Sequence, residues 1–259
     1  MNDDIKQVHF LARALKAPRI LDSAERLAEQ AREAGWSHEH YLAAVLDREV
    51  SARDASGANL RIRGAGFPAR KTIEDFVFDH QPALKRDTIA HLASNAYLAD
   101  AGNVVLLGPP GTGKTHLAIA LGVKAAHAGH RVMFATATEW VTRLQTAHAQ
   151  GRLPAELVKL RRYPLIIVDE VGYIPFEQDA ANLFFQLVSS RYEHASLILT
   201  SNLPFAKWAD VFSDQVVAAA MIDHIVHHAD VITLKGASYR LKHNQIETLP
   251  SARAENQAH

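Results

Sequence analysis

The sequence predicts an α/β fold, in which a parallel β-sheet is flanked by helices and preceded by a small all-α N-terminal domain. Two observations support this prediction. From about residue 104 to 234, short apolar runs alternate with stretches of helical periodicity, and this alternation is typical of a parallel sheet with helices on both faces. Residues 5 to about 50, by contrast, show helical periodicity alone.

The apolar runs are the expected strands, and residues 165–168 form the most apolar of them. The strands are expected at residues 104–107, 132–135, 165–168, 197–200 and 231–234. Helical periodicity between the strands predicts helices at residues 114–129, 138–149, 154–162, 178–194 and 214–228.

A change of composition marks the expected domain boundary. Serine, glycine and proline interrupt the periodicity over residues 51–70, which predicts a flexible junction. We therefore expect a helical N-terminal domain at residues 1–66 and a larger domain at 67–245, with a disordered polar tail at 246–259. About 25 residues follow the last expected strand, so any C-terminal lid is expected to be minimal.

Composition excludes several classes of protein. Lys plus Arg and Asp plus Glu both number 28, so no strong overall field attracts the chain to nucleic acid, and DNA binding would depend on local patches. The chain has no cysteine, which rules out disulfides and thiolate chemistry. It has neither a secretion signal at its acidic start nor a long apolar stretch, so we expect a cytoplasmic protein with no membrane partner.

A phosphate-binding loop follows the first expected strand. Residues 108–115 match the pattern G-x-x-x-x-G-K-[ST], in which backbone N–H groups and the start of the next helix surround phosphates. Lys114 is expected to contact the β- and γ-phosphates of ATP, and the Thr115 hydroxyl to hold Mg²⁺. The nucleotide-binding residues are therefore expected to include Gly108, Pro109, Pro110, Gly111, Thr112, Gly113, Lys114, Thr115 and His116.

Acidic and amide side chains follow two later strands. Asp169 and Glu170 come at the carboxyl end of the strand at 165–168, and Asn202 follows the strand at 197–200. Ligands of open α/β sheets bind at this edge. We expect Asp169 to hold the magnesium ion directly or through water, and Glu170 to act as general base toward the attacking water. Asn202 either positions that water or is a turn residue before Pro204.

Further segments of the sequence are more specific than the phosphate loop. They lie at residues 11–19, 67–69, 73–78, 166–173, 190–193, 200–202 and 236–240, and the most specific are Asp169-Glu-Val-Gly-Tyr173 and Gly236-Ala-Ser-Tyr-Arg240. With this ordered set, the chain resembles the IstB-like branch of the IstB/DnaC family of AAA+ ATPases over nearly its whole length.

The resemblance implies a P-loop AAA+ ATPase that assists insertion-sequence transposition. Such proteins assemble on double-stranded DNA as ATP-dependent homo-oligomers, remodel it, and recruit or activate a transposase. The resemblance also implies that Asn202 is the first sensor and that Arg240 is a second-sensor arginine. It leaves open a helicase loader of the DnaC type. A slowly hydrolysing ATP-gated clamp also stays open, whereas a small-molecule kinase would need mobile lid arginines that residues 178–228 almost lack.

Four smaller groups of residues allow two interpretations each. Phe76 and Phe78 either form walls of the adenine site or pack in the core. His224, His227 and His228 share a helical face, but this spacing is common and a zinc site is the less favoured reading. Two basic groups suit sequence-independent phosphate contacts or a solvated surface; they are Arg48, Arg53, Arg61, Arg63, Arg70 and Lys71, and Arg152, Lys159, Arg161 and Arg162.

The source of a trans-acting arginine is a final question. AAA+ oligomers usually complete each site with an arginine from a neighbour, commonly near the end of the helix before the last strand. Here no Lys or Arg lies between Lys207 and Lys235, and His224 stands where relatives typically have arginine. We expect either that Arg191 supplies the charge or that the protein hydrolyses ATP slowly.

Overall fold

The computed structural model describes residues 3–236 and 238–239. Internal contacts divide the chain into two compact units, Met1–Leu60 and Arg61–His259. The division lies earlier than the boundary expected near residue 66, and it falls within a helix.

The first unit is helical, as expected. It contains α1 (Asp3–Ala14), α2 (Pro18–Ala34) and the first part of α3 (His38–Gly64). The nearly buried Glu49 of α3 connects these helices, because its carboxylate accepts the backbone N–H of Arg19 at 2.9 Å and the Arg53 guanidinium at 2.6 Å. Arg53 also donates to the carbonyl oxygen of Lys16 at 2.8 Å. Arg53 therefore has a structural role here.

The predicted flexible junction over residues 51–70 is wrong as far as Gly64, because α3 continues without a break to that residue. An isolated glycine within a helix costs only about 1 kcal/mol, which packing can offset. The end of the helix belongs to the second unit. Arg61 Nε donates to the carbonyl oxygen of Ala126 at 2.7 Å. The carbonyl oxygen of Ala65 accepts the backbone N–H of Phe134 at 2.7 Å.

The second unit is built on a five-stranded parallel sheet in the order β2-β3-β4-β1-β5. Every strand predicted from the sequence is present. The bounds are β1 (Asn103–Leu107), β2 (Val132–Thr136), β3 (Leu165–Val171), β4 (Ser196–Ser201) and β5 (Ala229–Thr233). The α/β fold with a parallel sheet is thereby confirmed.

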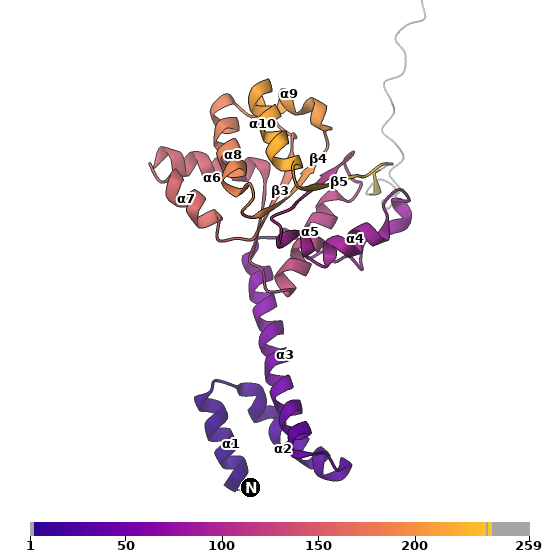
Figure 1. Cartoon of the computed structure of the whole chain (residues 1–259), viewed down its shortest axis with the longest axis vertical. Helices are drawn as coiled ribbons and strands as arrows, with labels where there is room; N and C mark the ends of the chain where they lie inside the picture. Colours follow the sequence, from indigo (N-terminus) through magenta and orange to yellow (C-terminus); the bar gives the residue numbers. More distant parts are fainter. Residues whose placement is uncertain (1–2, 237, 240–259) are drawn as a thin grey trace, which may run out of the picture. The chain divides into compact units, whose positions relative to one another are not determined.

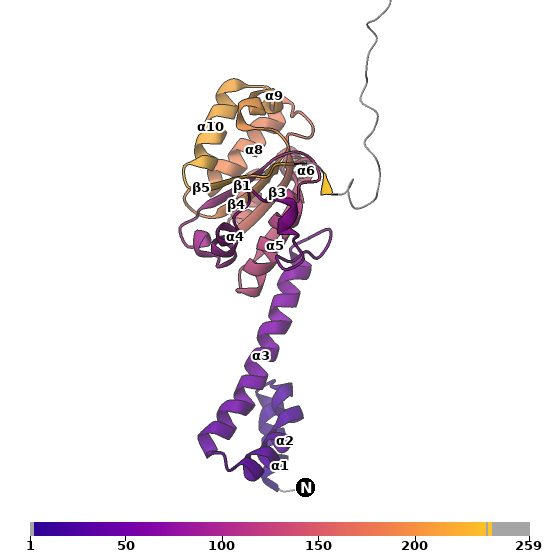
Figure 2. The ribbon, with the colours of Figure 1, turned by 90° about the vertical axis from the view of Figure 1, so that its right-hand side faces the viewer.

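Helices cover both faces of this sheet (Figures 1 and 2). One face packs against α4 (Arg86–Ala93) and α5 (Lys114–His127), and Val104 and Leu106 of β1 point to it. The other face, to which Val105 and Leu107 point, packs against α6 (Ala137–Ala149), α7 (Leu153–Leu160), α8 (Gln178–Arg191), α9 (Trp208–Phe212) and α10 (Gln215–Val226). This alternation is what a sheet with two buried faces requires.

Two of these helices, α4 and α9, were not expected from the sequence. Both are short, so neither gives a clear helical period. Short 3₁₀ turns lie at Phe78–His80, Ala96–Leu98 and Phe205–Lys207. Within the described part of the chain, no helix combines the length and the apolarity needed to cross a bilayer.

Candidate nucleotide-binding site

The phosphate-binding loop connects β1 to α5, as predicted. Gly111 and Gly113 adopt φ values of +77° and +98°, which residues with a Cβ rarely adopt. Lys114 begins α5 and is nearly buried, and its Nζ donates to the carbonyl oxygens of Gly108 at 2.7 Å and Pro109 at 2.9 Å. The loop thus curls around the ammonium group of its own lysine.

A bulge in β3 displays the two acidic residues. Val168 pairs with Leu199 and Val171 with Ser201, so Asp169 and Glu170 together oppose the single residue Thr200 of β4. Bulges of this kind redirect side chains. Glu170 has the positive φ of +62° and an exposed side chain, whereas Asp169 is buried.

The Thr200 hydroxyl holds this bulge in place. Thr200 Oγ1 donates to Asp169 Oδ1 at 2.6 Å and accepts the backbone N–H of Glu170 at 2.9 Å. A left-handed backbone costs free energy in a residue with a Cβ, and the bond to Thr200 stabilises it in Glu170. Sequence reasoning included Thr200 in the segment 200–202 but gave it no role, since that role depends on pairing between strands distant in the sequence.

The loop and the bulge meet at one point. Thr115 Oγ1 donates to Asp169 Oδ1 at 2.9 Å, so the two residues predicted to hold magnesium lie in direct contact. A hydroxyl and a carboxylate are the oxygen ligands that Mg²⁺ prefers. Their donor set therefore fits the ion.

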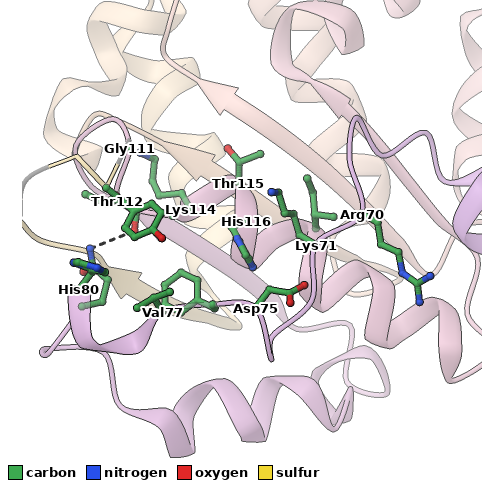
Figure 3. A pocket seen from close by; sticks show the side chains of 15 residues that line it. Arg70, Lys71, Asp75, Val77, His80, Gly111, Thr112, Lys114, Thr115 and His116 are labelled. Atoms are coloured by element: carbon green, nitrogen blue, oxygen red, sulfur yellow. Dashed lines mark hydrogen bonds between the residues drawn. The ribbon is translucent and has the colours of Figure 1, made fainter. Parts of the chain in front are cut away.

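A cavity of about 500 Å³ lies beside the loop (Figure 3). It is lined by Arg70, Lys71, Asp75, Phe76, Val77, His80, Gln81, Gly111, Thr112, Gly113, Lys114, Thr115, His116, Ile119 and Tyr239. Side chains of both charges and aromatic rings surround it. The size and lining suit a ligand with a phosphate chain and an aromatic base.

The two phenylalanines differ in position. Phe76 is nearly buried, lines the cavity, and contacts the His116 ring edge-on at 5.4 Å between centroids. Phe78 packs against Phe76 at 5.0 Å between ring centroids, and the Arg86 guanidinium lies 4.4 Å from the centroid of the Phe78 ring. Phe78 is not among the residues that line the cavity. Phe76 therefore packs in the core and also lines the cavity, whereas Phe78 is a packing residue.

The cavity also contains residues that the sequence did not indicate. Arg70 and Lys71 were considered for DNA contacts, but both line this cavity. His80 and Gln81 carried no signal in the sequence, and Tyr239 was noted only as part of the segment 236–240 that supports the family resemblance. Only the folded chain brings residues 80–81 and 239 to a loop at 108–115.

Of the two expected sensor residues, the structure describes Asn202 but not Arg240. Asn202 follows β4 at the edge of the sheet where Asp169 lies, and its Oδ1 is buried with no hydrogen-bond partner among the described residues. Arg240 lies outside the described residues.

Arg191 does not have the geometry of a residue that reaches a neighbouring subunit. It is 1% exposed, and its guanidinium donates to the carbonyl oxygens of Leu160 (3.0 Å), Tyr163 (2.8 Å), Pro164 (3.4 Å) and Ser196 (2.9 Å). Burial lowers its pKa to about 9, so it stays charged at neutral pH. The expectation of a trans-acting Arg191 is corrected accordingly: the side chain is enclosed in its own subunit, where it caps carbonyls.

His224 of α10 does not form one metal-binding group with His227 and His228, which follow this helix. His224 stacks on Tyr192 at 4.7 Å and its Nδ1 lies 3.2 Å from Ser189 Oγ. His227 and His228 instead approach Glu193, and all three side chains are exposed. Exposed clusters of this type are common, and the spacing does not identify a zinc site.

Comparison with known families identifies the chain. The model of the IstB-like ATP binding protein family matches residues 10–247. The chain belongs to this family. Two relatives support the assignment. A protein of Pseudomonas aeruginosa, named for ATP binding in insertion sequence IS21, is 42% identical over 91% of this chain and 89% of its own length. A Geobacillus stearothermophilus protein, named likewise for insertion sequence IS5376, is 34% identical over 93% and 96%.

Solved structures support the fold of this family member. AMPPCP-bound DnaA from Aquifex aeolicus has a TM-score of 0.55 at 21% identity, covering 71% of this chain and 59% of DnaA. DnaI has a TM-score of 0.53 at 20% identity, covering 65% of this chain and 90% of DnaI. The second unit therefore has the AAA+ fold.

Proposed function

We propose that this protein is an ATP-dependent, DNA-binding AAA+ ATPase that assists a transposase in insertion-sequence transposition. The contact of Thr115 with Asp169 at 2.9 Å carries the ATPase part of the proposal. It joins a phosphate-binding loop to a buried carboxylate, which is the arrangement that nucleotide hydrolysis on a P-loop requires.

The residues have distinct roles in this proposal. The loop amides and Lys114 bind the phosphates of ATP. Thr115 and Asp169 would hold Mg²⁺, which when bound neutralises charge on the phosphates. The exposed carboxylate of Glu170, aimed by the bulge, accepts a proton from the attacking water. Asn202, whose buried Oδ1 has no hydrogen-bond partner among the described residues, orients that water, and Arg240 is the proposed second-sensor arginine.

Family membership supports the biological setting. The two relatives are named for insertion sequences, which favours a transposition helper over a helicase loader. We propose that the protein assembles on duplex DNA as an ATP-dependent oligomer and recruits its cognate transposase, with the first unit contributing to DNA binding. The formal net charge of zero favours contact with the DNA backbone through local basic patches, with little sequence preference.

A slow ATP-gated clamp is the second candidate. Two observations favour it: Arg191 is enclosed in its own subunit, and no Lys or Arg lies between Lys207 and Lys235. An arginine supplied by a neighbour increases the rate of phosphoryl transfer by a thousandfold or more in other NTPases. Without one, ATP binding would hold the assembled state for longer.

A single substitution tests the nucleotide site. Lys114→Ala removes the charged donor to the phosphates, and we expect the Kd for a fluorescent ATP analogue with Mg²⁺ to rise by about 10- to 100-fold. Lys159→Ala, on the exposed face of α7, serves as the control. Equal affinity of the Lys114→Ala variant and the wild type would refute the proposed site.

A further inference from the structure

The segment that follows β5 lies directly on the phosphate-binding loop. The N–H of Tyr239 donates to the carbonyl oxygen of Gly111 at 3.0 Å. A Cβ on Gly111 would clash with Ser238 Oγ, and one on Gly108 would clash with the carbonyl oxygen of Leu234. The loop is therefore enclosed on the side of these two glycines by a segment more than a hundred residues later in the chain.

Gln81 bridges the loop and this segment. Its side chain is only 3% exposed, and both ends of its amide are used. Nε2 donates to the carbonyl oxygen of Thr112 at 3.2 Å, and Oε1 accepts the backbone N–H of Lys235 at 3.1 Å. Few side chains other than glutamine combine a donor and an acceptor at this length.

The direction of these bonds matters for phosphate binding. A loop binds phosphate through backbone N–H groups that point inward, so the carbonyl groups of the same peptides must point elsewhere. Two of these carbonyls accept hydrogen bonds from groups outside the loop. The N–H of Tyr239 donates to the carbonyl oxygen of Gly111, and Gln81 Nε2 donates to that of Thr112. A buried carbonyl without a partner is unfavourable, so these bonds stabilise the peptide orientations that phosphate binding requires.

We infer that Gln81 is a positioning residue of the phosphate-binding loop and that it couples the loop to the segment that contains Lys235, Ser238 and Tyr239. The inference rests on the proposed function. Tyr239 of the coupled segment lines the nucleotide cavity and packs against His80 at 4.8 Å between ring centroids. The loop and this wall of the cavity are thus set by a common group of hydrogen bonds.

This role has a specific kinetic signature. Loop amides contact phosphates in both the ground state and the transition state, and loss of such uniform binding raises KM while kcat is unchanged. A residue that only stabilised the fold would lower the free energy of unfolding but would leave the Kd for ATP as it is in the folded protein.

The test uses two variants of the full chain. Gln81→Met retains the length of the side chain and removes both hydrogen bonds. Gln81→Glu retains an acceptor for Lys235 but places a carboxylate opposite the carbonyl of Thr112. Gln186→Met, on an exposed position of α8, is the matched control. The Kd for a fluorescent ATP analogue, the KM and kcat for ATP, and the midpoint of urea unfolding are measured for each.

We expect Kd and KM to rise about tenfold in Gln81→Met and at least as much in Gln81→Glu, with kcat within about twofold of the wild type. The control should match the wild type. If Gln81→Met does not fold, Gln81→Glu decides the question by the same measurements. Unchanged Kd in the folded variant, or a fall in kcat at constant KM, would overturn the inference. Failure of the wild type to bind ATP would instead reject the proposed function.

Discussion

Thr200 donates a hydrogen bond from its hydroxyl to Asp169 Oδ1 at 2.6 Å, and both residues are almost completely buried. The same hydroxyl accepts the N–H of Glu170. One side chain therefore controls the orientation of the carboxylate proposed to hold magnesium and of the backbone that presents the proposed general base.

Thr200→Val should lower kcat for ATP by about 10-fold or more, because it removes the hydroxyl but retains the shape of the side chain. Thr200→Ser retains the hydroxyl and should keep most of the activity. Steady-state ATPase assays of the purified variants measure the difference. Equal rates for Val and Ser would show that the hydroxyl does not position the site.

Glu170→Gln should bind ATP as the wild type does but lower its cleavage by about a hundredfold or more, because the amide cannot accept the proton of water. It should also retain its complex with duplex DNA for longer in the presence of ATP. Single-turnover hydrolysis and DNA dissociation rates measure both effects. Glu177→Gln, an exposed carboxylate, is the control, and undiminished hydrolysis in Glu170→Gln would contradict the assignment of the base.

Arg191→Met should lower the free energy of unfolding by about 2–4 kcal/mol, because buried carbonyl groups lose their charged donor. The effect is on stability, so the ATPase rate per folded molecule should change little. Urea denaturation and an active-site titration separate the two quantities. Loss of activity at unchanged stability would point to a catalytic role that the buried position argues against.

His224→Arg should increase DNA-stimulated ATP turnover severalfold if this position faces the nucleotide of a neighbouring subunit, because a forked, permanent cation replaces an imidazole. His148→Arg, on an exposed position of α6, controls for added charge and DNA affinity. Turnover is measured at saturating duplex. A rate equal to that of the control would place the trans-acting group elsewhere.

Removal of residues 1–60 should weaken duplex binding and leave the Kd for ATP unchanged. The deletion should stop before Arg61, because Arg61 and Ala65 belong to the second unit and bond to Ala126 and Phe134 of that unit. Titrations at several salt concentrations should show steep salt dependence in the full chain, caused by release of counterions, and a shallower slope in the truncated one. Equal affinity and slope would exclude the first unit from DNA binding.

Much of the second unit could be predicted from the sequence, because its signals are local. Each strand is a continuous apolar run, and residues 108–115 form a contiguous motif whose glycines meet a local backbone requirement. The meeting of Thr115 and Asp169 followed from a general rule, since the carboxyl ends of parallel strands share one edge. Such signals need no knowledge of how distant segments pack.

The errors arose where tertiary contacts outweigh local preference. Gly57 suggested a break in a helix that continues without interruption through that residue. Arg191 at the end of α8 suggested a free cation, yet four carbonyls from the α7–β3 segment and β4 surround it. The period and composition of a segment contain no information about which groups from elsewhere will satisfy its charges.

The sequence by itself determined the class of fold and the family, and it indicated the residues proposed for the nucleotide chemistry, because each depends on short contiguous patterns. The tertiary structure alone decided how these atoms are held. The bulge at Asp169 and Glu170 exists only against Thr200, and Gln81 acquires a role only between Thr112 and Lys235. Hydrogen bonds between segments distant in the chain form when the whole fold is complete, and for that reason no local pattern predicts them.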